Sequence, residues 1–120
     1  MNKAEEKIKE LGFELPPFTS PQAVYVPTVR SGNLIFVSGQ GATREGKPVM
    51  LGHVGSDLSL EEGYRAAQVC GLNALTVLKA ELGDLDKIKR IVKVLGFVSS
   101  APGFDKQPLV INGFSELMEK

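Results

Sequence analysis

The amino-acid sequence predicts a single domain of the α+β class. Three observations lead to this prediction: two short apolar stretches around a set of turn residues, one long amphipathic helical pattern, and a second helical pattern near residue 120. A chain of 120 residues is expected to form one domain. With 42% hydrophobic and 23% charged residues, its composition is that of a globular protein and excludes a disordered chain.

The first expected element is a short helix. Ala4, Ile8 and Leu11 recur at helical spacing, and Gly12 is a suitable residue for its C-terminal stop. Such a short helix is marginal by itself, so it must dock on the rest of the chain. Three prolines within residues 14–21 then predict a stiff, extended connector.

Two antiparallel strands are expected next, in residues 24–29 and 34–38, with turn residues at 31–33 between them. Pro27 makes the first an edge strand or a bulged one. The second is apolar at four successive positions, so both of its faces are expected to be covered. A further short strand is possible at residues 49–51.

The longest helical pattern begins after Ser59 and ends at Gly83. Ser59 and Glu62 have the spacing of a capping box, which marks a helix start. A stripe of apolar and small residues repeats along this helix and is expected to face the sheet. It consists of Tyr64, Ala67, Gly71, Ala74, Leu78 and Leu82.

Residues 88–98 predict the longest strand, and a helix between strands suggests a βαβ-type crossover. A second helix is expected to begin near Pro108. The chain reaches Lys120 inside that helix, so we expect one domain over residues 1–120 that is cut short, with its C-terminal strands missing. Helices on a single face cannot cover strands that are apolar on both faces, which predicts association with further copies of the chain.

Charge and cysteine content exclude several classes of function. Lys+Arg and Asp+Glu are 14 each, so the net charge is zero, which argues against a protein built to grip nucleic acid. The single cysteine allows neither an internal disulfide nor a multi-cysteine metal site, and it fits a reducing, cytoplasmic environment. The charged N-terminus lacks a secretory pattern, and no apolar run is long enough to span a membrane.

Isolated reactive residues have ordinary structural interpretations. His53 is a candidate general base, but no Ser or Asp makes a triad with it by spacing, so a loop residue is favoured. Cys70 is interpreted as a packing residue rather than a nucleophile. Residues 39–41 match a dinucleotide fingerprint only superficially, because a polar loop follows. The basic run of residues 87–93 is interpreted as a solvated face, and the acidic residues lack metal-ligand spacing.

Three sequence motifs point to a known family. Tyr25 is followed thirteen positions later by Ser38-Gly39-Gln40, and the specific runs 95–104 and 107–113 follow the long helix. In these motifs the chain resembles the Rid/YjgF family of reactive intermediate deaminases, also called endoribonuclease L-PSP. The resemblance extends over nearly the whole chain, from about residue 4, and points to a longer branch that has an extra N-terminal helix.

The resemblance implies a chorismate-mutase-like α+β fold, with a mixed sheet, two helices on one face, and a homotrimer whose clefts lie between subunits. It implies hydrolysis of enamines and imines such as 2-aminoacrylate to a keto acid and ammonia, with no cofactor and no metal. Tyr25, Ser38, Gly39 and Asn112 match positions of the family's substrate site. The family's carboxylate-binding arginine would fall after residue 120, so the catalytic residues stay unassigned.

A cleft lined by Tyr25, Ser38, Gly39 and Asn112 is expected to bind a small carboxylate or imine metabolite. Tyr25 and Ser38 flank one predicted hairpin, and Asn112 is expected at the start of a helix, where free N–H groups favour an anion. The alternative is that Ser38 and Asn112 only cap local backbone groups. The leading function is therefore an imine or enamine deaminase. A non-catalytic, carboxylate-binding regulatory trimer comes second, and an endoribonuclease or translation inhibitor third.

Overall fold

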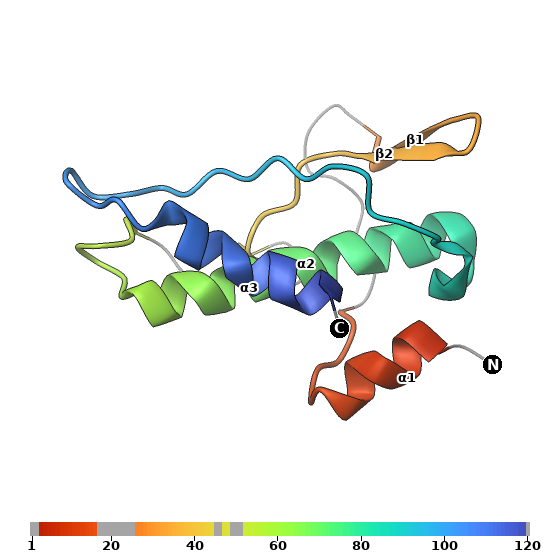
Figure 1. Cartoon of the computed structure of the whole chain (residues 1–120), viewed down its shortest axis with the longest axis horizontal. Coiled ribbons are helices and arrows are strands. Elements are labelled where there is room, and N and C mark those ends of the chain that lie inside the picture. The colour runs from red at the N-terminus through yellow and green to blue at the C-terminus, as the bar shows by residue number, and fades with distance from the viewer. Residues whose placement is uncertain (1–2, 17–25, 45–46, 49–51, 120) are drawn as a thin grey trace.

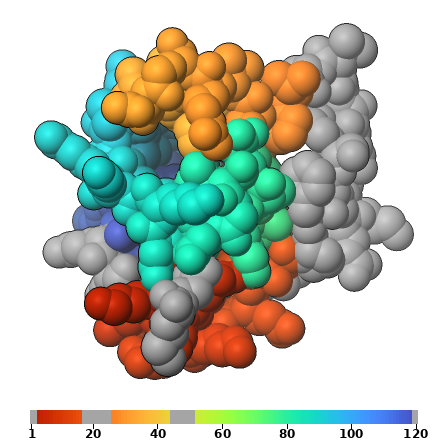
Figure 2. Space-filling model, turned by 90° about the vertical axis from the view of Figure 1, so that its right-hand side faces the viewer, coloured from red at the N-terminus to blue at the C-terminus, as the bar shows by residue number. Residues whose placement is uncertain are grey.

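The computed structural model describes residues 3–16, 26–44, 47–48 and 52–119. Two long helices, α2 and α3, lie side by side at its centre, and a β-hairpin and the N-terminal helix flank one end of α2 (Figures 1 and 2). The hairpin is one of two small antiparallel sheets in the described part, each of two strands. The predicted α+β class is confirmed.

The N-terminal helix α1 covers Lys3–Glu10, and Gly12 lies in the turn that follows it, as predicted. Gly12 has a φ of +85°, a conformation that glycine adopts without steric cost. Ile8 is buried, because α1 docks beside the C-terminal end of α2 (Figure 2). The hydroxyl of Thr76 in α2 donates to the carbonyl of Pro16 at 2.9 Å, which fixes the chain that leaves α1.

The hairpin consists of β1, Thr28–Ser31, and β2, Leu34–Val37. The strands pair from Thr28↔Val37 to Ser31↔Leu34, and Gly32, with a φ of +59°, lies in the two-residue turn between them. A second pair follows, β3, Thr43–Arg44, and β4, Lys47–Pro48. The strand expected at residues 49–51 and the first two residues of the strand expected at 24–29 lie outside the described residues.

The long helix α2 covers Leu60–Leu82, as predicted. The backbone N–H of Glu62 donates to Ser59 Oγ at 3.1 Å, and the Ser59 N–H donates to Glu62 Oε1 at 3.0 Å. These bonds confirm the capping box. The bond from the Ser59 N–H to the Glu62 carboxylate is the largest cause that lowers the pKa of Glu62, because it favours the ionised form. Gly83, with a φ of +82°, ends the helix by donating its N–H to the Lys79 carbonyl.

The face of α2 that contains Ala67 and Gly71 packs against α3, Gln107–Glu119, and not against a sheet. A Cβ on Gly71 would lie 2.9 Å from Leu117, and one on Gly113 would collide with the backbone of Tyr64. The prediction that this stripe faces the sheet is therefore wrong. The glycines permit close approach as expected, but the neighbour that uses the space is a helix.

A cluster of buried apolar residues joins α1, α2, α3 and the short 3₁₀ helix η1, Leu85–Lys87. Its members are Ile8, Leu72, Leu85 and Leu117. Leu78 is half-buried and packs against this cluster, so it is covered by helices and by the N-terminal segment. Burying these side chains is the main stabilising term that holds the four elements together.

Residues 88–98 form no strand, which corrects the prediction of a long strand and of the βαβ-type crossover. The segment runs as an extended trace alongside the helices and returns the chain to the start of α3 (Figure 1). Val92 is 71% exposed, Leu95 73% and Phe97 86%. The β-branched composition of the segment favours extended backbone, but a strand also needs a hydrogen-bonded neighbour, and no described strand supplies one.

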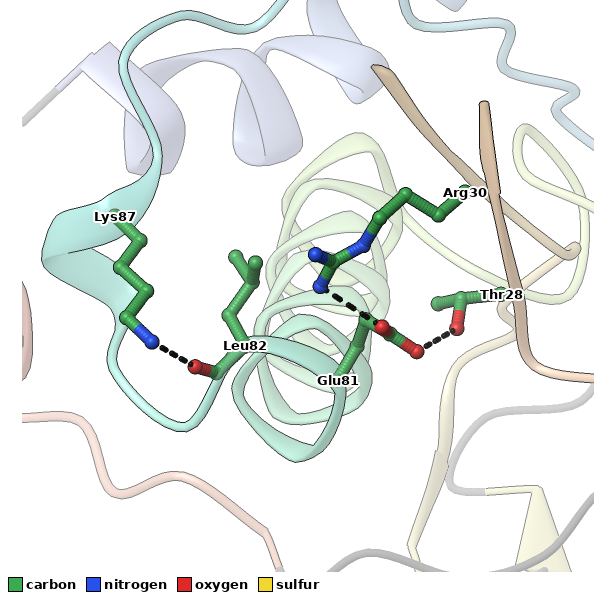
Figure 3. A network of polar contacts seen from close by, with 5 residues as sticks. All are labelled: Thr28, Arg30, Glu81, Leu82 and Lys87. Atoms are coloured by element: carbon green, nitrogen blue, oxygen red, sulfur yellow. Dashed lines mark hydrogen bonds and ion pairs between the residues drawn. The ribbon is translucent and has the colours of Figure 1, made fainter. Parts of the chain in front are cut away.

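The hairpin is tied to α2 by Glu81, near the C-terminal end of the helix. Thr28 Oγ1 donates to one carboxylate oxygen at 3.0 Å, and Arg30 Nη2 pairs with the other at 2.9 Å (Figure 3). Leu34 and Phe36 of β2 are 47% and 59% exposed, so the expectation that both faces of this strand are covered is not met within one chain. Among the described helices, none is long and apolar enough to cross a membrane.

Candidate functional site

Ser38 lies at the open end of the hairpin, directly after β2. Its backbone N–H donates to the Pro27 carbonyl at 2.9 Å, and its hydroxyl donates to the Val26 carbonyl through a short hydrogen bond. The hydroxyl proton is therefore engaged, and the lone pairs of Oγ are what it can offer to a ligand. Such an oxygen can accept a hydrogen bond from an imine N–H, an amino group or a water.

Because Gly39 has no side chain, the surface next to Ser38 is accessible. Gly39 is exposed, and a Cβ placed on it would meet no atom within 4 Å. The stretch that follows is held by α2, because Asn73 Nδ2 donates to the carbonyls of Gly41 at 3.0 Å and Thr43 at 2.9 Å. Because β3 follows Gly41 and no helix does, the loop interpretation of residues 39–41 is confirmed over the dinucleotide one.

Asn112 is the sixth residue of α3 and not its start, which corrects the expected placement. Gln107 begins the helix, where its side chain donates to the Phe104 carbonyl at 2.9 Å and to Ser100 Oγ at 3.2 Å. Only the first four N–H groups of a helix lack intrahelical partners, so the anion-binding argument does not apply to Asn112. Its half-buried side-chain amide makes no hydrogen bond within the described residues and can still donate and accept.

The described part of the chain does not bring Ser38 and Asn112 into contact. No hydrogen bond joins the two residues, and β2 and α3 do not touch each other in this part of the fold. Tyr25 lies outside the described residues. A cleft that uses all of these side chains therefore requires more than the described contacts of one subunit, and the inter-subunit cleft stays a prediction.

A second polar group lies between α2 and α3 and could not be foreseen from the spacing of its residues. Tyr64 Oη donates to Glu116 Oε2 at 2.7 Å, and this hydrogen bond raises the pKa of Tyr64. Asn112 is four residues before Glu116 and so lies on the same face of α3. An open hollow of about 320 Å³ is lined there by Leu60, Glu61, Tyr64, Arg65 and Leu109.

Metal and thiol chemistry have little support in the described residues. No group of three His, Cys, Asp or Glu side chains in this part of the chain could hold a metal ion. Cys70 is partly buried in the middle of α2, and burial raises the pKa of its thiol, which keeps the nucleophilic thiolate scarce. The packing interpretation of Cys70 agrees with this environment.

The fold and the hairpin end define a small α+β protein with a polar, solvent-open strand terminus. Residues 5–120 match the model of the family described as "YjgF/chorismate mutase-like, putative endoribonuclease". The chain belongs to this family, as the sequence resemblance predicted.

Individual relatives agree with this assignment. The chain is 40% identical over 111 residues to protein TCP17 of Trypanosoma cruzi, covering 92% of this chain and 69% of that protein. The crystal structure of Atu1372 from Agrobacterium tumefaciens, a protein of unknown function, matches with a TM-score of 0.86 and 49% identity, over 95% of this chain and 70% of that one. A "putative endoribonuclease" from Shewanella oneidensis matches with a TM-score of 0.87 and 31% identity, over 98% and 78%.

Proposed function

We propose that this protein is a hydrolytic deaminase that converts reactive enamine and imine metabolites, such as 2-aminoacrylate, to a keto acid and ammonia. Membership of the family supports a substrate site at the positions that match its motifs. The Ser38 hydroxyl at the open end of the hairpin supports a role in binding a substrate nitrogen or a water. The observation that carries the proposal is the hydroxyl of Ser38, which donates a hydrogen bond to the Val26 carbonyl and so has its lone pairs left to accept one from a ligand. An acceptor at this place suits a nitrogen-bearing substrate or an attacking water.

The reaction needs positioning and proton transfer rather than a cofactor. An enamine first tautomerises to the imine, and water then adds to the electrophilic carbon to give a carbinolamine. This intermediate expels ammonia and leaves the keto acid. In the proposed site Ser38 Oγ accepts a hydrogen bond from the substrate nitrogen or the water, and the Asn112 amide orients the carboxylate end. Tyr25 supplies a hydroxyl at the position that matches the family's tyrosine.

The test measures ammonia release from 2-aminoacrylate generated in the assay. Ser38→Ala is expected to lower kcat/KM at least tenfold, while Ser115→Ala serves as the matched control because Ser115 is exposed on α3. Equal turnover by both variants, with unchanged folding, would exclude Ser38 from the reaction. No turnover by the wild-type chain would reject the deaminase assignment for this chain.

A second candidate is a non-catalytic trimer that binds a carboxylate metabolite. It requires the same cleft but no proton transfer, and the Arg30 guanidinium, which pairs with Glu81 at 2.9 Å, does not separate the two candidates because both bind a carboxylate. Binding of a small keto acid by calorimetry, weakened in Tyr25→Phe and Asn112→Ala but without turnover, would support this alternative. Equal affinity of all three proteins would remove both residues from the site.

An RNA-directed activity is the third candidate and rests on the name of the Shewanella relative. The zero net charge of the chain disfavours it, because RNA binding draws most of its affinity from phosphate contacts. Cleavage of a labelled single-stranded RNA by the same protein preparation can be compared directly with its release of ammonia in the deaminase assay. We place either enzymatic activity in the cytoplasm, where a lone cysteine such as Cys70 stays reduced.

A further inference from the structure

A hydroxyl–imidazole pair lies at the opposite end of the molecule from the hairpin, where the loop before α2 meets the segment before α3 (Figure 1). Ser99 Oγ and His53 Nδ1 are 2.7 Å apart and share a hydrogen bond. The two residues are 46 positions apart in the chain, so their spacing gives no sign of the pair. Both side chains are exposed, which leaves them open to a reagent from solvent.

The register of two short extended segments creates this pair. Val54 and Ser100 form a parallel bridge, in which the Val54 N–H donates to the Ser99 carbonyl at 2.9 Å. The Ala101 N–H donates in turn to the Val54 carbonyl, also at 2.9 Å. A parallel bridge sets the preceding residues, His53 and Ser99, beside each other on one face.

The loop that bears His53 is tightly built. The His53 carbonyl accepts hydrogen bonds from the N–H groups of residues 56–58, and the His53 N–H donates to Asp57 Oδ2 at 3.2 Å. Gly52 and Gly55 have φ values of +127° and +102°, and a Cβ on Gly55 would lie 3.0 Å from Phe104. Both φ values favour glycine, so these two residues permit the tight turn that fixes the backbone of His53.

We propose that Ser99 and His53 form a second reactive site, in which Ser99 is a nucleophile towards carboxylic esters and similar acyl donors and His53 is its base. The arrangement is a dyad, because the Asp57 carboxylate binds the backbone of His53 and not its ring. The N–H of Ser100, the residue after the nucleophile, makes no hydrogen bond within the described residues and is available to an oxyanion. None of these groups takes part in the proposed deaminase site.

The reaction is balanced with the ester and water as the only reactants. With the imidazole proton on Nε2, Nδ1 takes the hydroxyl proton while Ser99 Oγ forms a bond to the carbonyl carbon. The alkoxide or phenolate of the ester leaves and receives this proton, which gives an acyl-serine. Water then adds to the acyl carbon with loss of its proton to His53, the Oγ–acyl bond breaks, and the serine regains its proton.

The test uses p-nitrophenyl acetate, release of p-nitrophenol, and mass spectrometry of the peptides to locate the acetyl group. In the wild-type chain, we expect acetylation of Ser99 at least a hundredfold faster than that of Ser115, an exposed serine on α3 that serves as the internal control. His53→Gln should remove most of this difference, and Ser99→Ala should abolish it. Ser31→Ala, at an exposed position of β1, is the matched control variant and should leave it unchanged.

Two outcomes would overturn the proposal. The first is a rate at Ser99 in the wild-type chain no higher than at Ser115, which needs no variant and so cannot be confused with misfolding. The second is an undiminished rate at Ser99 in a folded His53→Gln protein. Acetylation of lysines is expected as background and is separated from the serine signal by peptide mapping.

Discussion

Single carboxylates set the position of whole elements in this protein. Asp86, in η1, accepts the N–H of Lys3 at 2.6 Å and that of Ala4 at 2.8 Å, and so caps the N-terminus of α1 from a residue more than eighty positions away. The bond from Ala4 is the largest cause that lowers the pKa of Asp86, and the bond from Lys3 is the next. The charged form of this residue therefore favours the docking of α1.

Acid should release α1. Because the folded-state pKa of Asp86 lies below the ordinary 3.8, the carboxylate stabilises docking above pH 3.8, and this contribution is lost as the pH falls through the folded-state value. Asp86→Asn should give the released state already at neutral pH. Amide hydrogen exchange of α1 measures this, with Asp105→Asn, an exposed loop substitution, as control. Unchanged protection of α1 in Asp86→Asn would contradict the role.

Glu81 has the same kind of role for the hairpin (Figure 3). Its contacts with Thr28 and Arg30 are partly solvated, so Glu81→Gln should change the free energy of unfolding by less than about 1 kcal/mol. The same variant should nevertheless loosen β1, measured as faster amide exchange in residues 28–31. Glu61→Gln, an exposed position on the same helix, should leave that exchange unchanged. Equal exchange in both variants would show that the hairpin is held by other contacts.

At the scale of elements, the closest approach is between α2 and α3. Gly113 faces the backbone of Tyr64, and Gly71 faces the side chains of Leu117 and Phe114. The contact of Gly113 with backbone needs a residue without a side chain, and the contact of Gly71 with side chains favours one, which explains glycine in the middle of two helices despite its low helix propensity. The helix pair is therefore fixed by these two positions as well as by apolar burial.

Gly113→Ala should separate the two helices. Alanine would favour helical backbone by about 1 kcal/mol, but the collision with Tyr64 should outweigh this and lower the free energy of unfolding by roughly 1–3 kcal/mol. Chemical denaturation measures the change. Gly41→Ala is the control, because a Cβ there meets only Thr43 at an ordinary 3.8 Å. A Gly113→Ala protein as stable as the wild type would show that α3 adapts without cost.

At the scale of the molecule, one chain leaves much apolar surface uncovered. Phe36 on β2 is 59% exposed, and Leu95 and Phe97 on the extended segment are 73% and 86% exposed. The segment 89–98 also has backbone groups that no described strand pairs. An exposed strand such as β2, and an exposed extended segment with unpaired backbone groups, are surfaces on which further strands or other subunits pack.

Association into a homotrimer is the expected result. Sedimentation should give a mass three times the 12.9 kDa of one chain at micromolar concentration. Phe97→Glu should shift the protein towards smaller species, because it places a charge on the surface expected to be covered. A wild-type mass of one chain at this concentration would reject the trimer. A trimer that Phe97→Glu does not weaken would place the interface elsewhere.

Local signals in the sequence determined the helices. The capping box of Ser59 and Glu62 and the stop at Gly83 fixed the limits of α2, and Gly12 and Pro108 located α1 and α3 to within a residue or two. Each of these signals acts over one helical turn, so its physics is contained in a few consecutive residues. The hairpin was predictable for the same reason, but its bounds were not: the first strand covers Thr28–Ser31 and not residues 24–29, and Ser38 follows the second strand.

Tertiary structure alone decided which surfaces meet. The stripe on α2 predicts an apolar face of small residues, but it does not indicate that α3 covers this face. Residues 88–98 have the composition of a strand, but no described strand lies beside them. Asn112 falls inside α3, and the pairs Tyr64–Glu116 and His53–Ser99 join residues 52 and 46 positions apart. Such contacts depend on how elements pack, because periodicity reports which face is apolar and carries no information about its partner.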